Sequence, residues 1–495
     1  MKILTGPQIK EADKFTIENE PISSIQLMER ASAAIAEILK LKISNYHSIL
    51  VLAGKGNNGG DGLAIARLLS ETMDCSVFMP FATDELSEEC HSNLTQLPPN
   101  VVVTNSLETT KLTSETLIID ALLGTGMKGN LDETLSTLIA SVNELSNYVI
   151  SIDVPSGMCT EFGNINQIII RANETITLQF PKLAMLLPEA GEYCGKITIC
   201  PIGINVEEND SFETPYSFTT TNFIKKRLKK RTKFANKGTY GHALLICGSK
   251  GMNGAALLAT NAALRSGCGL VTLHLPEEER FAVQANCPSA ILSLDQDAFF
   301  SEIPTDLPKY SVLAIGPGLG QNSVTIDAFR VLLESFDKPM VIDADAINIL
   351  SKYPELKRYI PKNSILTPHP RELQRLIGDW SDEEHKLKKV IHLAVETDSV
   401  IVLKGAYTTI CTVNGHFYFN PTGNSGMAKG GSGDILTGFI AGLLARGYDS
   451  LDAAIIGVYI HGSAGDKVAS IYGQEAMNSK DIIDYIPVVM KELYE

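Results

Sequence analysis

The sequence predicts an α/β protein of two domains, each with a parallel sheet covered by helices on both faces. The chain has 495 residues, 44% of them hydrophobic and 20% charged, so it is too apolar to stay disordered and too long for one ordinary core. In both halves, short runs rich in β-branched residues alternate with helical patterns, which is typical of parallel α/β folds. Between the halves the composition becomes polar and charged, which suggests a boundary.

Composition also limits the partners and the compartment. The formal net charge is −15, so we expect no broad basic surface for nucleic acid or for anionic lipid, although a local anion site is compatible with it. The nine cysteines are odd in number and form no C-x-x-C pair, which fits scattered thiols in a reducing compartment. No apolar run approaches the roughly 20 residues of a membrane span. These features predict a soluble, cytoplasmic protein.

The elements of the first half follow in order. Thr5 and Gln8 have the spacing of a capping box, which predicts a helix at the start of the chain, and an amphipathic pattern predicts a second helix over 22–41. A further helix is expected over 62–70. The predicted strands are 48–54, 75–81, 101–104, 116–124, 148–157 and 195–205.

The domain boundary is expected between 206 and 237, where an acidic and polar stretch is followed by a basic one. We predict a first domain over 1–213, a linker over 214–227 and a second domain over 228–495. The basic run at 225–233 is interpreted as a solvated helix face, or as the rim of a phosphate site, rather than as a nucleic-acid surface. In the second half a helix is predicted over 254–267, with strands over 242–249, 270–276, 311–320, 339–346, 364–370 and 399–405.

A glycine-rich loop, AGKGNNGGDG at 53–62, lies directly between a predicted strand and a predicted helix. Glycines allow close backbone approach, and the free N–H groups of a helix N-terminus favour phosphate. The loop does not carry the GK[ST] of a P-loop. A tight turn without a ligand is the alternative, but Asn57, Asn58 and Asp61 add polar groups that a mere turn does not need.

Two aspartates close strands of the same half. Asp120 ends one strand and Asp153 ends the next, so with Asn58 and Ser156 they are expected to meet at the carboxyl edge of the sheet. Such an oxygen cluster suits a hard cation or a sugar hydroxyl, whereas each aspartate alone is equally compatible with a helix N-cap. A second phosphate-facing loop is expected around Gly124, Gly126 and Gly129.

In the second half, the segment GGSGDILTG at 430–438 brings three glycines in front of an apolar helix. Its backbone N–H groups are suited to an anion hole, and Asp434 beside them is suited to take a proton from a hydroxyl while a phosphoryl group is transferred. The alternative for Asp434 is an acidic residue that only stabilises the first turn of the helix. No Walker motif occurs, which disfavours a P-loop ATPase.

Two further segments contribute candidates. Lys404 and Thr408 follow a strand upstream of the glycine loop and are candidates for a counter-charge and a hydroxyl at a nucleotide phosphate. His369 lies between two prolines in TPHPREL, which should keep the loop extended and leave the imidazole projecting. The other histidines, including His461, have no ligand spacing for zinc.

These motifs together resemble a known family. The segments GKGNNGGDGLAIARLL, DALLGTG, SIDVPSG and FPKLAMLLPEAG resemble the NAD(P)H-hydrate epimerase domain. The segments TPHPREL, LKGAYTTI and GGSGD resemble the ADP-dependent (S)-NAD(P)H-hydrate dehydratase. The resemblance covers nearly the whole chain, and it implies a Rossmann-like three-layer domain followed by a ribokinase-like α/β domain.

For the first half, the resemblance implies an epimerase that interconverts the R and S forms of hydrated NADH or NADPH. It implies a potassium ion at Asn58, Asp120 and Ser156. Asp153 is our candidate for proton transfer. Lys182 is a weaker candidate because it is equally compatible with an exposed rim lysine. The implied hydrate-binding residues are Asn57, Asn58, Gly59, Gly60, Asp61, Gly124, Thr125, Gly126, Met127, Lys128, Gly129, Asn130 and Asp153.

For the second half, the resemblance implies dehydration of the S form at the expense of ADP. Asp434 deprotonates the ring hydroxyl, its oxygen attacks the β-phosphorus, AMP is released, and loss of phosphate restores the nicotinamide ring. We expect Mg²⁺ from general phosphoryl-transfer chemistry, with no ligand that the sequence identifies. The implied hydrate-binding residues are Ala255, Gly318, His369 and Asp434, and the implied ADP-binding residues are Lys404, Gly405, Ala406, Tyr407, Thr408 and Gly433.

Other readings stay open at this point. One is a ribokinase-like vitamin kinase fused to a nucleotide-binding regulatory domain, and another is a nonenzymatic nucleotide sensor. The motifs do not decide between ADP and ATP, or between the hydrates of NADH and NADPH. The family resemblance implies a homo-oligomer, such as a tetramer, whose small-molecule ligands are the hydrates NADHX and NADPHX together with ADP.

Overall fold

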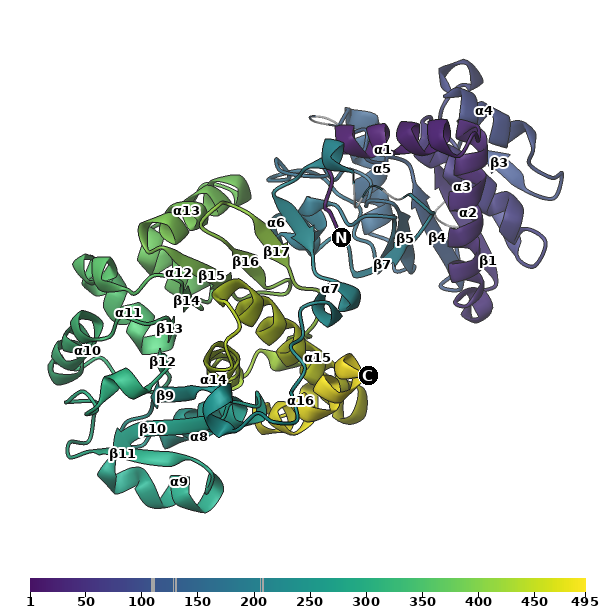
Figure 1. Ribbon diagram of the computed structural model, residues 1–495. Coiled ribbons are helices and arrows are strands. Elements are labelled where there is room, and N and C mark those ends of the chain that lie inside the picture. Colours follow the sequence, from purple (N-terminus) through teal and green to yellow (C-terminus); the bar gives the residue numbers. More distant parts are fainter. Residues whose placement is uncertain (108–111, 128, 130, 205, 207–208) are drawn as a thin grey trace. The chain divides into compact units, whose positions relative to one another are not determined.

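The computed structural model describes residues 1–107, 112–127, 129, 131–204, 206 and 209–495 (Figure 1). The chain divides into two compact units. The first is Met1–Tyr216 with Asp382–Glu384, and the second is Ser217–Ser381 with His385–Glu495. Each unit is built on its own sheet with helices around it, which confirms the predicted α/β fold class. Lys128 and Asn130, two of the expected binding residues, lie outside the described residues.

The first unit contains a seven-stranded parallel sheet with the order β3-β2-β1-β4-β5-β6-β7. The strand order reverses between β1 and β4, so the carboxyl ends of these two strands form the topological switch point at which open α/β sheets bind ligands. The strands are β1 (Ser48–Ala53), β2 (Asp74–Phe78), β3 (Val102–Thr104), β4 (Thr116–Ala121), β5 (Val149–Ile152), β6 (Glu174–Leu178) and β7 (Lys196–Cys200).

Strand β6 was not expected because its sequence, ETITL, is half polar. Its polar residues are nevertheless buried, and Glu174 is held by an ion pair with Lys42 at 2.6 Å and by the Thr198 hydroxyl, which donates to it at 2.6 Å. Tertiary partners at distant positions in the chain therefore make this strand possible.

The helices of the first unit begin with α1, at which the expected capping box is present: the Gln8 backbone N–H donates to Thr5 Oγ1, and the Thr5 N–H donates to Gln8 Oε1. Helix α3 begins at Asn57, five residues before the predicted start, so the polar residues of the glycine-rich loop form its first turn. The helices are α1 (Gly6–Asn19), α2 (Ser24–Lys40), α3 (Asn57–Leu69), α4 (Glu88–Thr95), α5 (Glu133–Asn143) and α6 (Pro188–Gly191).

Alternate residues of the strands fill two cores on the two faces of this sheet. Ile49 and Val51 of β1 pack in the core with α2 and α3, whereas Leu50 and Leu52 pack in the core with α5. Because successive side chains of a strand point to opposite faces, a continuous apolar strand needs helices on both sides. The result is the expected Rossmann-like, three-layer arrangement.

The second unit contains a ten-stranded sheet with the order β11-β10-β9-β12-β13-β14-β15-β16-β17-β8. The pairs from β11 to β15 are parallel, and β15, β16 and β17 pair antiparallel. The strands are β8 (Tyr216–Phe218), β9 (His242–Ile246), β10 (Leu270–Pro276), β11 (Ile291–Asp295), β12 (Val312–Ile315), β13 (Met340–Ile342), β14 (Ser364–Leu366), β15 (Ser399–Leu403), β16 (Thr409–Cys411) and β17 (Phe417–Phe419).

Residues 214–227, expected as a linker, contain β8 and helix α7 (Thr221–Lys225). The Thr219 N–H donates to the Phe419 carbonyl at 2.9 Å, and Ile224 is fully buried in the core of the second unit. Most of the segment is therefore part of that unit's fold. Its few apolar residues are spaced among threonines, which hid them from a search for continuous apolar runs.

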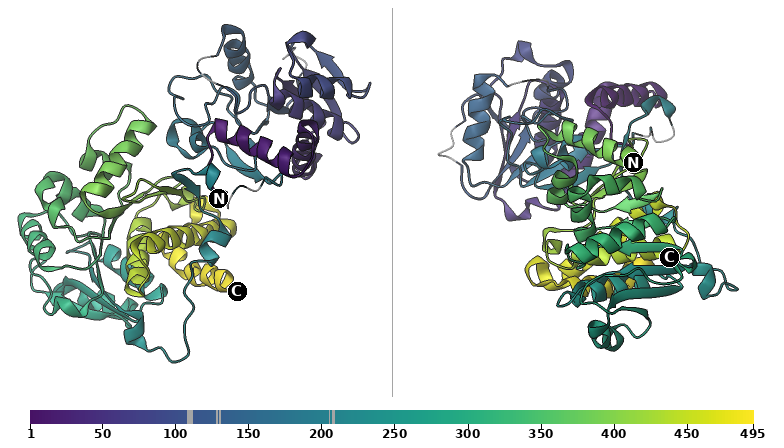
Figure 2. Two further views of the ribbon diagram at one scale, coloured as in Figure 1. Left: turned by 45° about the horizontal axis from the view of Figure 1, so that its top comes forward. Right: turned by 90° about the vertical axis from the view of Figure 1, so that its left-hand side faces the viewer.

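Helix α14 is buried at the centre of the second unit, together with α8 and α15. It is apolar on all sides, as expected for a helix enclosed by protein, and its glycines let α8 approach: a Cβ at Gly438 would lie 1.9 Å from the Ala259 carbonyl oxygen. Figure 2 shows the yellow helices on one side of this sheet and the green ones on the other. The helices are α8 (Asn253–Arg265), α9 (Arg280–Asn286), α10 (Ser323–Ser335), α11 (Ala344–Lys352), α12 (Pro370–Ile377), α13 (Glu383–Glu396), α14 (Ser432–Ala445), α15 (Ser450–Ala476) and α16 (Ser479–Tyr494).

Among the described residues, no helix combines the length and the apolar character that crossing a bilayer would require.

Candidate functional site

The glycine-rich loop of the first unit turns between β1 and α3 at the switch point of the sheet. Gly56 is the N-cap of α3 and makes no side-chain capping bond, so the N–H groups of the first turn remain open to an anion. A Cβ at Gly54 would lie 1.8 Å from the Leu122 carbonyl oxygen, and one at Gly59 would lie 1.9 Å from the Gly54 carbonyl oxygen. Close backbone packing thus explains two of the glycines, whereas a Cβ at Gly56 would meet only open space.

We expect Gly59→Ala to destabilise the first unit and Gly56→Ala to leave its stability nearly unchanged. The new methyl of Gly59→Ala collides with backbone that cannot move away, a type of overpacking that costs about 1–3 kcal/mol or more. Thermal unfolding should show a transition lowered by several degrees for Gly59→Ala only, since about 1 kcal/mol shifts Tm by roughly 2–4 °C in a domain of this size. A similar loss in both variants would contradict this explanation.

Asp120, Ser156 and Asn58 lie together around Leu123. Asp120 is fully buried, and it accepts hydrogen bonds from the Ser151 hydroxyl at 2.7 Å and from the Ser156 hydroxyl and N–H at 2.5 and 2.9 Å. The Leu123 N–H donates to Ser156 Oγ at 2.8 Å, and Asn58 Nδ2 donates to the Leu123 carbonyl at 3.0 Å. Burial raises the pKa of Asp120. The three residues expected at one oxygen-rich site are therefore brought together.

Asp153 and Lys182 form a buried ion pair directly after β5. Lys182 is only 1% exposed and donates to Asp153 Oδ1, to Thr177 Oγ1 at 2.8 Å and to the Leu178 carbonyl at 3.2 Å. The reading of Lys182 as an exposed rim lysine is therefore wrong. Asp153 also has a positive φ of 66°, a conformation that a non-glycine residue rarely adopts. The fold thus holds this ion pair with the Asp153 backbone in a conformation that non-glycine residues rarely adopt.

Two other carboxyl groups act electrostatically on this pair. Burial raises the pKa of Asp13, on α1, to about 6, with the charge of Asp153 adding to the shift and Lys182 opposing it. Burial also raises the pKa of Asp61 well above its usual value, against a hydrogen bond that the Ser32 hydroxyl donates to Asp61 at 3.1 Å. Asp13 was not among the expected residues. The one signal in the sequence that pointed to Asp13 was its place beside the apolar Ala12 on the first helix.

The second loop of this unit lies next to the first. A Cβ at Gly124 would be 3.1 Å from the Asn58 Cβ, and a Cβ at Gly6 would be 3.2 Å from the Thr125 carbonyl oxygen. Residues 124–127 thus lie between the start of α3 and the start of α1, and Asn57 is exposed in the first turn of α3. The described members of the two expected binding loops therefore share one edge of the sheet.

In the second unit, Asp434 lies in the first turn of α14 behind the expected glycine loop. Gly431 is the N-cap with a φ of 96° and no side-chain capping bond. The Ser432 N–H donates to the Lys429 carbonyl at 3.4 Å, so the Gly433 and Asp434 N–H groups are the ones open to an anion. Burial raises the pKa of Asp434 to about 6, with Asp343 adding to the shift and Lys404 opposing it. A carboxylate of this kind is suited to accept a proton near neutral pH.

Lys404 lies beside this loop in a network of carboxylates. Its Nζ is 2.8 Å from Asp343 Oδ1 and 3.9 Å from Glu372 Oε2, and a Cβ at Gly433 would lie 3.6 Å from it. Thr437 Oγ1 donates to Asp343 Oδ2 at 2.6 Å. Asp343 and Glu372 were not among the expected residues. Asp343 closes a strand as Asp120 and Asp153 do, so the same rule could have found it.

The expected nucleotide segment follows Lys404 as a turn between β15 and β16. Thr408 Oγ1 donates to the Gly405 carbonyl at 3.2 Å and accepts from the Gly405 N–H at 3.4 Å, so the hydroxyl closes the turn. Gly405 and Ala406 are exposed, whereas Tyr407 and Thr408 are half-buried. The backbone of the turn is thus accessible next to Lys404.

The His369 side chain is 44% exposed, so the imidazole projects as expected, but it also forms the N-cap of α12. Its Nδ1 accepts from the Arg371 N–H at 3.0 Å and from the Glu372 N–H at 3.3 Å, and its Nε2 is 3.4 Å from Glu372 Oε1. Burial, with the positive charge of Lys404 adding to it, lowers the pKa of His369. The imidazole is therefore fixed on one side and faces the Lys404 network on the other.

The remaining expected residues lie at the start of α8. A Cβ at Gly318 would be 3.1 Å from the Ala255 Cβ, and Ser249 Oγ donates to the Gly318 carbonyl at 2.8 Å, so these two substrate candidates are neighbours. His461 is buried on α15, where its Nε2 lies 3.4 Å from Ser432 Oγ. Burial lowers the pKa of its imidazole to about 4. It is therefore a neutral support of the glycine loop.

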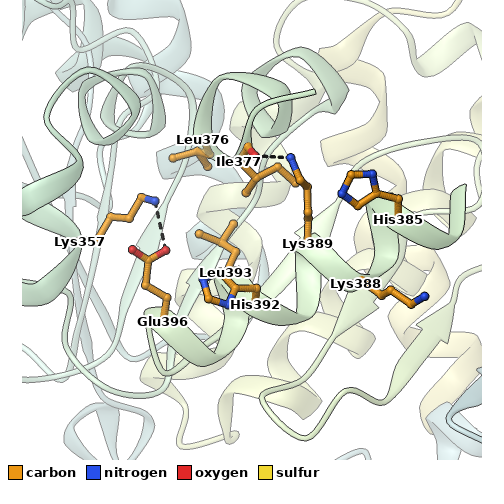
Figure 3. Close-up of a pocket in the computed structure, with 9 residues that line it drawn as sticks. All are labelled: Lys357, Leu376, Ile377, His385, Lys388, Lys389, His392, Leu393 and Glu396. Carbon is orange, nitrogen blue, oxygen red and sulfur yellow. Dashed lines mark hydrogen bonds and ion pairs between the residues drawn. The ribbon is translucent and has the colours of Figure 1, made fainter. Parts of the chain in front are cut away.

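A cavity of about 500 Å³ lies at the opposite end of α12 from His369 (Figure 3). Two of its lysines already have partners within the unit: Lys357 pairs with Glu396 at 3.1 Å, and Lys389 donates to the Ile377 carbonyl at 2.9 Å. An eight-residue helix is about 12 Å long, so the cavity is separate from the Lys404 network. It is lined by Lys357, Leu376, Ile377, His385, Lys388, Lys389, His392, Leu393 and Glu396.

Comparison with known proteins finds two family models, one matching residues of the first unit and one matching residues of the second. Residues 243–488 match the family model described as NAD(P)H-hydrate dehydratase, and residues 24–184 match the model of the YjeF-related protein N-terminus. A ribokinase-like superfamily protein from Enterococcus faecalis is 27% identical, with a TM-score of 0.52 over 57% of this chain and 98% of that one. The expected ribokinase-like fold of the second unit is thereby confirmed.

Two relatives match over essentially the whole chain. The bifunctional NAD(P)H-hydrate repair enzyme of Moorella thermoacetica is 33% identical over 100% of this chain and 98% of its own length. That of Coxiella burnetii is 35% identical over 98% of both chains. Because these matches span both units, the chain belongs to the family of bifunctional NAD(P)H-hydrate repair enzymes.

Proposed function

We propose that the first unit interconverts the R and S hydrates of NADH and NADPH, and that the second unit dehydrates the S form at the expense of ADP. The observation that carries the proposal is Asp434, a carboxyl with a raised pKa of about 6 in the first turn of α14, beside open N–H groups and Lys404. Hydroxyl activation and phosphoryl transfer both need groups of this kind at one place.

Dehydration follows from this arrangement. Asp434 takes the proton of the ring hydroxyl, and the oxygen attacks the β-phosphorus of ADP as the bond to the bridging oxygen breaks and AMP leaves. The N–H groups behind Gly431 and the ammonium of Lys404 stabilise the charge on the transferred phosphoryl group. The phosphate ester is a far better leaving group than hydroxide. Its loss, with a proton from the neighbouring ring carbon, restores the nicotinamide ring.

The described residues do not form a protein cage for Mg²⁺. No group of three or more His, Cys, Asp or Glu side chains among them is arranged to hold a metal ion, and Asp343 and Glu372 face Lys404. The expected Mg²⁺ stays a prediction, and the step above is derived without it.

The oxygen-rich cluster of the first unit fits a potassium ion better. Its oxygens are the Asp120 carboxylate, Ser156 Oγ and the Leu123 carbonyl, which also accepts from Asn58 Nδ2, and hard cations prefer oxygens of this type. A cation held there would compensate the buried charge of Asp120 and fix Asn58 beside the first glycine loop. It would also supply positive charge near the dinucleotide phosphates.

Epimerisation requires a group that moves protons at the hydroxylated ring carbon. Asp153 is held by Lys182, and Asp13 has a pKa of about 6, so this edge of the sheet combines a charged pair with a carboxyl that exchanges protons near neutral pH. We assign the proton transfer to Asp153.

The function is tested by incubating the purified protein with hydrated NADH and ADP. We expect the absorbance of NADH to return, with AMP and phosphate formed in equal amounts. ATP in place of ADP shows which nucleotide is used, and hydrated NADPH shows the preference between the two substrates. Formation of ADP from ATP with a pyrimidine or thiazole alcohol, and no recovery of NADH, would instead support the vitamin kinase.

The thiols of the chain bear on its location, whereas its assembly stays to be tested. All nine cysteines are free thiols and most are buried, which supports the cytoplasm, where the substrate cofactors also occur. The homo-oligomer, such as a tetramer, stays a prediction that light scattering of the purified protein would test.

A further inference from the structure

We propose that Asp343 is a positioning residue of the dehydratase, which holds Lys404 against the glycine loop and acts on Asp434 through its negative charge. The inference rests on the proposed function, because it gives Asp343 a part in the dehydration reaction.

Asp343 links three elements that the reaction needs in register. It follows β13 directly and is only 1% exposed. One carboxylate oxygen accepts from Lys404 at the end of β15 at 2.8 Å, and the other accepts from Thr437 on α14 at 2.6 Å. Thr437 is three residues after Asp434, so the two side chains share a face of α14. Asp343 therefore fixes the lysine relative to the helix that carries the base.

The same contacts place Asp343 at the glycine loop. A Cβ at Gly433 would lie 3.7 Å from Asp343 Oδ2 and 3.6 Å from Lys404 Nζ. The pair thus packs directly against the backbone that is suited to bind the transferred phosphoryl group. Lys404 is a flexible side chain, and without a buried partner it has many other rotamers available. Its position next to the loop depends on Asp343.

The charge of Asp343 matters as well as its position. Burial is the main reason that the pKa of Asp434 rises to about 6, with Asp343 adding to it and Lys404 opposing it. The other groups facing this region are Glu372 and His369 on α12, neutral His461 on α15, and Cys247 after β9, whose thiol pKa burial raises. Removing the charge of Asp343 also leaves Lys404 uncompensated, so both effects lower the pKa of Asp434.

The lowered pKa of Asp434 sets the direction in which the pH dependence of dehydration should change. Asp434 acts as a base only when ionised, so kcat/KM for dehydration should fall as the pH drops through about 6 in the wild type. In Asp343→Asn this fall should move to lower pH. The rate at high pH should drop about three- to tenfold, because a weaker base is less effective and Lys404 is less well placed. If Asp343→Asn only disturbed the packing, the rate would fall, but the pH at which kcat/KM declines, the acid limb of the pH profile, would not move.

The test compares pH profiles of Asp343→Asn, Thr437→Val and the wild type, with epimerisation as a reference activity. Thr437→Val removes one hydrogen bond to Asp343 but keeps its charge, so its pH limb should stay at the wild-type position. The proposal would be overturned if the acid limb of the pH profile stayed at the wild-type position in Asp343→Asn, or if it moved by the same amount in Thr437→Val.

A second variant tests position apart from charge and keeps the proposal open to refutation if Asp343→Asn does not fold. Asp343→Glu retains the charge with a longer side chain, so the pH limb should stay near 6 while the KM for ADP rises. An unchanged KM would refute the positioning role. If the wild type itself does not convert hydrated NADH with ADP, the proposed function fails, whereas turnover by the wild type with an unmoved limb in Asp343→Asn refutes only this inference.

Discussion

Asp434→Asn is expected to abolish dehydration of the S hydrate and to leave epimerisation at the wild-type rate. The amide has the shape of the carboxyl but cannot take the proton of the ring hydroxyl, and loss of a general base typically costs about 10²- to 10⁴-fold. The fold should survive because the side chain is only partly buried, and an amide needs no ionisation in a place where burial raises the pKa of Asp434. Formation of AMP and NADH from hydrated NADH and ADP measures the loss.

The matched control is Asp327→Asn, the same chemical change at an exposed position on α10. It should retain both activities. Interconversion of the R and S hydrates, followed by chromatographic separation, measures epimerisation in the same preparations. Equal loss of both activities in Asp434→Asn would refute the division of labour between the two units.

How much of the fold could be predicted depended on where the hydrophobic signal lies in the chain. The strands with continuous apolar runs, such as β1 and β4, were predicted because a parallel strand buried on both faces needs no polar residue. Strand β6 was missed because its buried Glu174 is matched by Lys42, and β16 was missed because it begins inside LKGAYTTI, which was interpreted as a nucleotide segment. Distant partners are not visible in a local window.

The candidate sites show the same limit. Asn58, Asp120 and Ser156 could be brought together from the sequence because each lies at or just after the carboxyl end of a strand of one parallel sheet, and the structure places them around Leu123. Asp13 and Glu372 could not be placed at a site from the sequence. Each lies on a helix and gains its role from residues far away in the chain. His369 projects as expected, with its side chain 44% exposed, but its N-cap bonds, which turn Nδ1 toward the backbone, were not predicted.

Both units hold an aspartate directly after a strand, paired with a lysine from another segment. In the first unit these are Asp153 and Lys182, and in the second they are Asp343 and Lys404. A buried pair of this kind is weak evidence for stability, because desolvation offsets much of the attraction, and removing one partner leaves an uncompensated charge. Such pairs are more readily explained by what they do at a site that receives a negatively charged dinucleotide or nucleotide.

The second large effect is expected for Asp153→Asn, which should slow epimerisation by about 10²-fold or more and leave dehydration unchanged. Asparagine is the suitable replacement because, like aspartate, it tolerates the positive φ of 66° at this position. The amide cannot exchange the proton that epimerisation requires. Rates of approach to equilibrium between the separated R and S hydrates provide the measurement.

This substitution also leaves Lys182, which is 1% exposed, without its counter-charge, a change that can cost about 3–5 kcal/mol. The double variant Asp153→Asn with Lys182→Met removes both charges and should recover most of the lost thermal stability. It should not recover epimerisation, because a neutral pair still lacks the group that moves the proton. If the single variant interconverts the hydrates at the wild-type rate, or if activity returns together with stability in the double variant, Asp153 is a structural residue and the proton is transferred by another group, with Asp13 the first to be examined.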